Sequence, residues 1–263
     1  MIAGMKDEKI RSLLQASKSA GPLRVGFLLI PNFSMLAFAS AIEPLRAANR
    51  MAGQELFTWV ISSPTGGPTE ASNGVVVTAD GDPELLQTCR LVFACSGLDI
   101  KKYCTKETLN VIRKLDRNGG IIGAICTGTY LMAAAGLLDE KRCTIHWENI
   151  DGLAEEFPLL EITNELFEID DTRITCSGGT ASLDMILYLI SQVHGNTLAA
   201  QVSENLFMTA SATPATVNVW SCVRVLVYRI QSYWPWSAIW KKGWKSPIHK
   251  LSSHERLIYP PGS

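Results

Sequence analysis

One cysteine stands where the sequence pattern changes from a strand to a helix. Residues 121–130 read I-I-G-A-I-C-T-G-T-Y, an apolar run that stops at Cys126 and continues as an Ala-rich segment. This pattern is typical of a buried parallel strand that turns directly into a helix, and the small residues Ala124 and Gly128 flank the turn. The sequence therefore predicts that Cys126 lies at the carboxyl end of a sheet.

A thiol in that position suits nucleophilic or ligand-binding chemistry. Unpaired N–H groups and the positive dipole end of the next helix stabilise an anion, so we expect the pKa of Cys126 to be lowered. A buried cysteine that packs as a small apolar side chain fits the pattern equally well. A second strand-to-helix turn, C-S-G-G-T at residues 176–180, has glycines that would let backbone N–H groups face an anion. A Gly-Gly pair before a helix is more commonly an ordinary turn.

Alternating apolar runs and amphipathic segments surround these two turns. Ser40 and Glu43 have the spacing of a capping box, with Pro44 in the first helical turn and Gly53 after the helix end. The alternation predicts an α/β fold with a doubly wound, mostly parallel sheet of the flavodoxin-like three-layer type, which binds ligands at the carboxyl ends of its strands. The predicted strands are residues 23–30, 57–63, 75–78, 91–95, 121–125, 143–146, 166–169 and 173–176, the last two as a hairpin, and the predicted helices are residues 40–51, 83–88, 106–118, 127–135, 148–157, 180–193 and 197–208.

Length and charge divide the chain into three predicted segments. The 263 residues, 47% hydrophobic and 19% charged, supply one large domain with a full core at residues 22–208. Residues 1–21 form a polar arm, with a short amphipathic helix through Ile10, Leu13 and Leu14, and we expect the arm to be poorly ordered. Of the net charge of −1, residues 210–263 contribute +6, from seven basic residues and one acid, so residues 1–209 carry −7 and do not suit nucleic acid.

The cysteines and the chain start bear on cofactors and compartment. Seven cysteines, an odd number with no C-x-x-C spacing, indicate neither a disulfide framework nor a zinc site, and we expect no cofactor. The N-terminal residues M-I-A-G-M-K-D-E-K mix charges where a signal peptide needs an apolar stretch, so a cytoplasmic protein is expected. Met5 serves equally well as the true start.

Five stretches of the sequence, in order and spacing, carry a family resemblance. They are PNFSMLAFASAIEPLRAANR (31–50), AICTGTYLMAAAGLLD (124–139), TIHWEN (144–149), NELFEID (164–170) and CSGGTASLDM (176–185). With them, the sequence between about Leu23 and Met208 resembles the GlxA group of AraC-type transcriptional regulators. The resemblance implies an N-terminal ThiJ/PfpI-type domain with the class I glutamine amidotransferase-like fold, a homodimer, and a double helix-turn-helix domain that binds promoter DNA.

The resemblance also assigns residues, and it points away from an enzyme. Cys126 matches the nucleophile position of the superfamily, but Thr127 follows it where protease-like branches have a histidine. The position of the acid that would hydrogen-bond the thiol is occupied by Ala37, and the capping box already accounts for Glu43. His146 could serve as a base, although a histidine at a strand end is more often a packed residue. No nucleophile, base and orienting group are expected to assemble.

The first hypothesis is therefore a small-molecule sensor that keeps the fold and the pocket of the enzymes without their chemistry. Regulators of this kind are expected to sense arginine, carnitine or betaine-like amines, and aromatic rings beside an acid suit such cations. For each aromatic residue taken alone, ordinary core packing is the simpler interpretation. The residues expected to line the pocket are Cys126, Thr127, Phe33, His146, Trp147, Ser177, Gly178, Gly179 and Thr180.

Two alternatives belong to other classes of protein. One is a ThiJ/PfpI-like enzyme that uses Cys126 on an amide, carbonyl or isocyanide, against which Ala37 counts. The other is a structural dimerisation domain. Binding of an amine that raises the melting temperature would separate the sensor from both.

The tail, residues 209–263, is predicted to be out of frame. Five of the seven tryptophans lie between Trp220 and Trp244, and Arg224, Arg229 and Pro235 interrupt the apolar run, so no membrane helix is expected. Codons for residues 240–247 read one base earlier permit M-E-E-G-L-E-E-P, which resembles the helix leading into the DNA-binding domain of these regulators. We expect a frameshift after Met208, or a sequencing error there, a disordered tail of about 55 residues, and loss of specific DNA binding.

Overall fold

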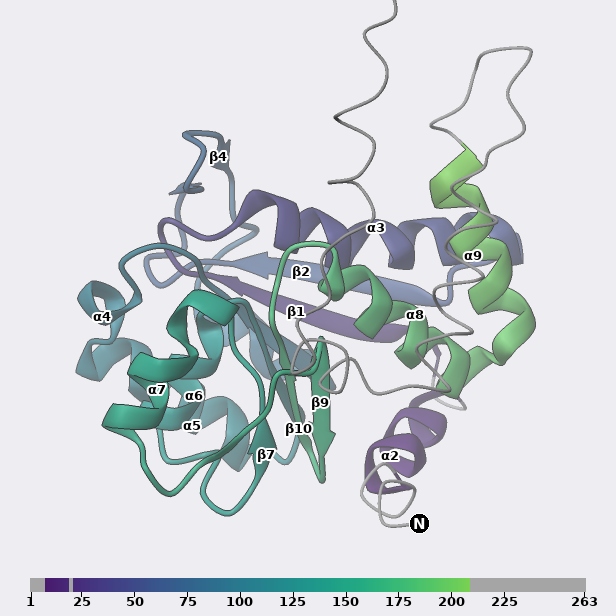
Figure 1. Ribbon diagram of the computed structural model, residues 1–263. Helices are drawn as coiled ribbons and strands as arrows, with labels where there is room; N and C mark the ends of the chain where they lie inside the picture. The colour runs from purple at the N-terminus through teal and green to yellow at the C-terminus, as the bar shows by residue number, and fades with distance from the viewer. Residues whose placement is uncertain (1–7, 19–20, 209–263) are drawn as a thin grey trace, which may run out of the picture. The chain divides into compact units, whose positions relative to one another are not determined.

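A six-stranded sheet forms the centre of the structure (Figure 1), a computed structural model that describes residues 8–18 and 21–208. Its order is β2-β1-β5-β6-β10-β9, and neighbouring strands are parallel except β10 and β9. Central strands are apolar throughout because helices cover both faces, which confirms the predicted fold class. The strands are β1 (Leu23–Leu29), β2 (Phe57–Ser62), β5 (Leu91–Cys95), β6 (Ile121–Ile125), β9 (Phe167–Asp170) and β10 (Arg173–Cys176).

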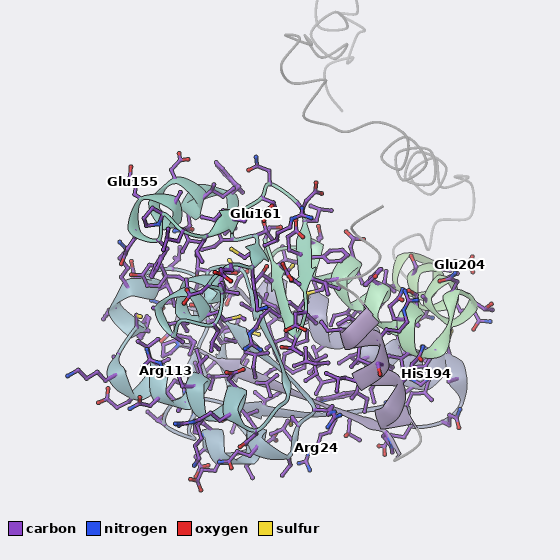
Figure 2. The ribbon with its side chains drawn as sticks, turned by 90° about the horizontal axis from the view of Figure 1, so that it is seen from below. Arg24, Arg113, Glu155, Glu161, His194 and Glu204 are labelled. Atoms are coloured by element: carbon purple, nitrogen blue, oxygen red, sulfur yellow. The ribbon has the colours of Figure 1, made fainter. Side chains whose placement is uncertain are left out.

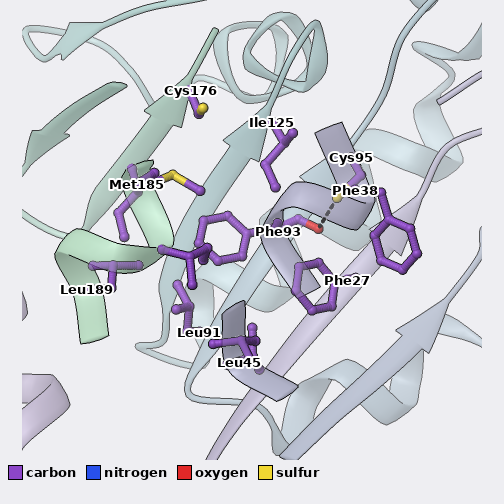
Figure 3. Packing of buried hydrophobic residues seen from close by; sticks show 14 of the residues in the cluster. Phe27, Phe38, Leu45, Leu91, Phe93, Cys95, Ile125, Cys176, Met185 and Leu189 are labelled. Atoms are coloured by element: carbon purple, nitrogen blue, oxygen red, sulfur yellow. Dashed lines mark hydrogen bonds between the residues drawn. The ribbon is translucent and has the colours of Figure 1, made fainter. Parts of the chain in front are cut away.

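Two hydrophobic clusters lie on opposite faces of this sheet. One cluster packs Phe27 and Phe93, whose rings stack with centroids 6.0 Å apart, under α3 (Met35–Ala52), α8 (Ala181–His194) and α9 (Asn196–Met208), as Figure 3 shows for part of it. The other cluster lies under η1 (Pro83–Thr88), α4 (Ile100–Tyr103), α5 (Lys106–Arg117), α6 (Gly128–Ala134) and α7 (Ile150–Glu156). Strand residues alternate between the two clusters, as the pleat requires.

The helix after β1 begins earlier than the capping-box spacing predicts. α3 starts at Met35, and the Ser34 hydroxyl accepts a hydrogen bond from the Ala37 N–H at 3.3 Å, so Ser34 is the N-cap. Pro44 therefore lies inside the helix, and Glu43 pairs with Arg46 at 2.7 Å instead of capping. The capping-box prediction was wrong because the competing cap lies one and a half turns upstream; the predicted stop at Gly53, with φ of 63°, is confirmed.

The N-terminal arm contains a helix that belongs to the domain core. α2 (Glu8–Lys18) buries Ile10 and Leu14 completely against the cluster under α3 and α8, and Gln15 Nε2 donates to the Gln192 carbonyl at 3.4 Å. The amphipathic helix is as predicted, but the expected poor order is wrong for residues 8–18. The apolar stripe of α2 is short, so the sequence alone does not indicate that it packs against α8.

The segment between α6 and β9 departs most from prediction. A strand was predicted at residues 143–146, but the observed strand, β7 (Arg142–Cys143), ends at Cys143. β7 pairs with β8 (Glu161–Ile162) outside the main sheet. The Thr144 N–H donates to Thr175 Oγ1 at 2.9 Å, so a side chain replaces the ladder and the strand ends. Residues 147–149 form the short helix η2 (Trp147–Asn149). β3 (Thr69–Glu70), β4 (Val76–Val77) and α4 complete the domain, and of these only β4 was anticipated.

The predictions for the tail, its frame, its disorder and its lost DNA binding, concern residues 209–263 and lie outside the described residues. Within the described ranges, none of the helices is both long enough and apolar enough to cross a membrane.

Candidate functional site

Cys126 occupies a sharp turn between β6 and α6, as the pattern predicts. Its φ of +61° is in the left-handed region, which few residues other than glycine adopt, and its N–H donates to the Cys176 carbonyl at 2.9 Å. That hydrogen bond continues the β6–β10 pairing past the end of the strand. The thiol is thereby held at the carboxyl edge of the sheet, between the ends of β5 and β10.

The thiol is not activated, contrary to the expected lowering of its pKa. Burial raises the pKa of Cys126 to about 11, and the hydrogen bond from the Thr127 backbone offsets only part of the effect. The negative charge of Glu148 raises the pKa further. The prediction failed because it considered the helix end and not the desolvation, which is the larger effect at a side chain buried this deeply.

Thr127 uses its hydroxyl to brace the site. The buried Thr127 Oγ1 donates to the Gly97 carbonyl at 2.6 Å, in the loop after β5. The Leu98 N–H in turn donates to the Asn32 carbonyl at 3.0 Å, so the loops after β1, β5 and β6 are connected by hydrogen bonds. Thr127 therefore positions the edge, and its hydroxyl proton is engaged by the Gly97 carbonyl.

No carboxylate reaches the thiol from α3. Ala37 is buried in the core, where the superfamily's acid would stand, and Glu43 lies on the exposed side of the helix in its pair with Arg46. The ring of Phe33 is also fully buried and packs edge-on against Phe38 with centroids 5.8 Å apart. Phe33 thus contributes backbone, and not its ring, to the surface of the carboxyl edge.

His146, Trp147 and Glu148 form an exposed group beside the thiol. Trp147 is 72% exposed, and the centroids of its ring and of the His146 ring are 5.9 Å apart. His146 Nδ1 lies 3.7 Å from Glu148 Oε2, and the Glu148 side chain is 60% exposed. Sequence reasoning missed Glu148, although it directly follows the predicted pair in the stretch T-I-H-W-E-N. Trp147 is therefore a surface residue, and core packing does not account for it.

The turn at residues 177–180 lies against the elbow. Gly178 and Gly179 have φ of +89° and +56°, and the Gly178 N–H points at Cys176 Sγ, 3.4 Å away. Ser177 is tied through its N–H and hydroxyl to the Leu166 carbonyl at 2.9 and 3.0 Å. Thr180 is exposed at the start of α8, and its hydroxyl makes no capping hydrogen bond.

Among the described residues, the side chains at this edge are not arranged as a nucleophile, a base and an orienting group. The thiol is protonated at neutral pH, the Thr127 hydroxyl donates to the Gly97 carbonyl, and His146 and Glu148 face each other at the surface. Among residues 8–18 and 21–208, no group of three or more His, Cys, Asp or Glu side chains is arranged to hold a metal ion.

Two of the known proteins that this chain resembles in sequence are transcriptional regulators. The chain is 50% identical over 182 residues to the HTH-type transcriptional regulator CdhR of Pseudomonas aeruginosa, covering 69% of this chain and 54% of that protein. It is 41% identical over 202 residues to the HTH-type transcriptional regulator GlxA of Rhizobium meliloti, covering 76% and 62%. The chain thus spans about half the length of the curated relatives it matches.

A solved structure and a more distant enzyme complete the comparison. The crystal structure of an AraC family transcriptional regulator from Pseudomonas putida matches with a TM-score of 0.65 and 28% identity, covering 70% of this chain and all of that one. An isonitrile hydratase of Pseudomonas putida is 27% identical over 174 residues, 66% of this chain and 73% of the enzyme. The DJ-1/PfpI family model matches residues 24–192. The chain therefore belongs to the DJ-1/PfpI family.

Proposed function

We propose that residues 22–208 are the effector-sensing domain of an AraC-type transcriptional regulator, and that the carboxyl edge of the sheet binds a small cationic amine. The single observation that carries the proposal is the exposed group His146, Trp147 and Glu148, in which the charge of Glu148 reaches Cys126. Trp147 is 72% exposed, so its indole is open to a ligand. An indole face attracts a cation by about 0.5–2 kcal/mol, more when the pair is desolvated.

The ligand class follows from the charges at this edge. Glu148 and the quadrupole of Trp147 favour a cationic head, and the exposed Thr180 hydroxyl and the glycine turn offer polar groups for the other end of a zwitterion. Arginine, carnitine and betaines all combine a cation with a carboxylate. The remaining residues expected to line the site are Cys126, Thr127, His146, Ser177, Gly178 and Gly179, with the backbone of Phe33.

Calorimetric titration and thermal shift test this proposal. Arginine, carnitine and glycine betaine are titrated into the wild-type chain, and at least one should raise its melting temperature by mass action. Trp147→Ala and Glu148→Gln should each weaken binding about tenfold while the melting temperature without ligand stays unchanged.

Glu155→Gln is the matched control. Glu155 is an exposed carboxylate on the neighbouring helix α7, labelled in Figure 2 at the rim of the domain, and it makes no ion pair within the described part of the chain. The control should bind like the wild type. Equal losses in Glu148→Gln and Glu155→Gln would show a general charge effect, and no binding of any of the three amines would refute the ligand class.

A second candidate function, an enzyme acting through Cys126, is supported by the strained elbow and by the isonitrile hydratase relative. Turnover of an amide, carbonyl or isocyanide that disappears in Cys126→Ser would establish it. We favour the sensor because the thiol is protonated at neutral pH and, among residues 8–18 and 21–208, no acid or base is hydrogen-bonded to it.

The regulator also requires a partner copy and DNA. We infer a homodimer from the family resemblance, and the frameshift predicted after Met208 implies that this chain has lost specific promoter binding. Sedimentation of the full chain tests the first and an operator-binding assay tests the second, both separately from the ligand.

A further inference from the structure

A pocket lies at the edge of the sheet opposite to Cys126. It has a volume of about 180 Å³ and is formed where η1 and α5 meet the starts of β5 and β6. Leu86, Val92, Leu115 and Ile122 provide apolar walls, and each of these residues is buried. The amine site at the carboxyl edge uses none of these residues, so the pocket is a separate feature of the domain.

Polar residues and one basic residue line the pocket beside its apolar walls. Arg90 lines the pocket, is exposed, and makes no ion pair within the described ranges. Lys114 Nζ and Glu84 Oε1, 3.0 Å apart, join α5 to η1, and neither residue lines the pocket. Arg90 is therefore the charged residue of the lining.

The thiol of Cys89 lies inside the pocket lining. Its Sγ packs near Gly26, where an added Cβ would be 3.2 Å away. Burial raises the pKa of this thiol, and the hydrogen bond with the Thr88 side chain and the charge of Arg24, labelled in Figure 2, offset part of the effect. Cys89 therefore provides a thiol in the lining that can report on what binds there.

We propose that this pocket is a second ligand site, for a small carboxylate with a short apolar body. The apolar walls disfavour a strongly hydrated inorganic anion, because they offer no hydrogen bonds to replace its lost water. Arg90 provides a planar pair of N–H donors that matches a carboxylate. The volume admits one aromatic ring or a short aliphatic chain. The domain then responds to two chemically different molecules, an amine at one edge of the sheet and an apolar acid at the other.

Benzoate and hexanoate, each compared with its neutral amide, are the probes. Titration of the full chain, followed by calorimetry and NMR, should show saturable binding of an acid with a Kd of about 1 mM or tighter and much weaker binding of its amide. Arg90→Ala should weaken binding of the acid about tenfold or more, the loss of a charge-assisted hydrogen bond. Arg50→Ala is the matched control, because Arg50 is an exposed arginine at the end of α3 on the other face of the sheet.

Two further measurements keep the outcome independent of folding. Asn118→Trp changes an exposed rim residue, so it should block the pocket without disturbing the core. Bound acid should slow alkylation of Cys89, read by peptide mass mapping, and should leave Cys126 unaffected. Equal binding of acid and amide, unchanged affinity in Asn118→Trp, or no saturable binding of either acid would refute the second site, and none of these results bears on the amine site.

Discussion

Gly178 lies directly against Cys126. A Cβ at position 178 would be 2.7 Å from Cys126 Cβ and 3.2 Å from its Sγ, closer than real Cβ atoms approach a neighbour's Cβ. Two strand-to-helix turns, separated in the sequence by α6, α7 and the hairpin, thus meet without a side chain between them. This contact makes residue 178 a determinant of the space around the thiol.

Gly178→Ala should therefore destabilise the domain by about 1–3 kcal/mol, since it adds a steric overlap to a φ of +89°. Gly179→Ala is the control, because residue 179 also has positive φ but open space around its Cβ position. It should cost about 1 kcal/mol from backbone strain alone. Urea unfolding measures both, and equal losses would show that the contact with Cys126 is unimportant.

Cys126 should react slowly with alkylating agents at neutral pH. With a pKa of about 11, its thiolate fraction rises about tenfold per pH unit from neutrality to near pH 10. Iodoacetamide labelling followed by mass mapping should show that rise without a plateau. A plateau near pH 7 would mean an activated thiol and would favour the enzyme.

The same pKa makes stability depend on alkaline pH. In the unfolded chain the thiol ionises near pH 9.0, and in the folded chain near 11, so the folded state binds more protons between these values. The stabilisation from the neutral thiol is fully present below about pH 9 and is lost as the pH rises to about 11. Cys126→Ser, which should fold normally, is expected to lose less stability over this interval in urea titrations.

Trp147→Ala and Phe33→Ala should have opposite signatures. Trp147 is exposed, so its removal should change the free energy of unfolding by less than about 0.5 kcal/mol. Phe33 is fully buried against Phe38, so its removal should cost about 3–5 kcal/mol. A large loss of stability in Trp147→Ala would instead identify its indole as a packing residue.

The true start of α3 can be tested with two serines. Ser34→Ala removes the side-chain acceptor of the Ala37 N–H and should cost about 1 kcal/mol. Ser40→Ala, inside the helix, should change stability by less than about 0.5 kcal/mol. Thermal unfolding of both variants measures the two losses of stability. A larger loss in Ser40→Ala than in Ser34→Ala would support the capping box at Ser40 instead.

The sequence by itself determined the six strands of the main sheet and the elbow. Apolar runs such as residues 91–95 and 121–125 match β5 and β6 to the residue, because a strand covered on both faces must be apolar along its whole length. The break at Cys126 and the hairpin before Cys176 were equally local signals. The bounds of η1, residues 83–88, follow from Asp82 and Pro83 at its start.

Tertiary structure decided everything that depends on what packs against what. The pKa of Cys126 is raised because neighbouring loops bury the thiol, and the charge of Glu148 reaches it from another segment. The docking of α2 and the pocket between η1 and α5 depend in the same way on surfaces far apart in the sequence. Hydrogen bonding and periodicity act over a few residues and can be predicted locally, whereas desolvation and charge are sums over all neighbours in space.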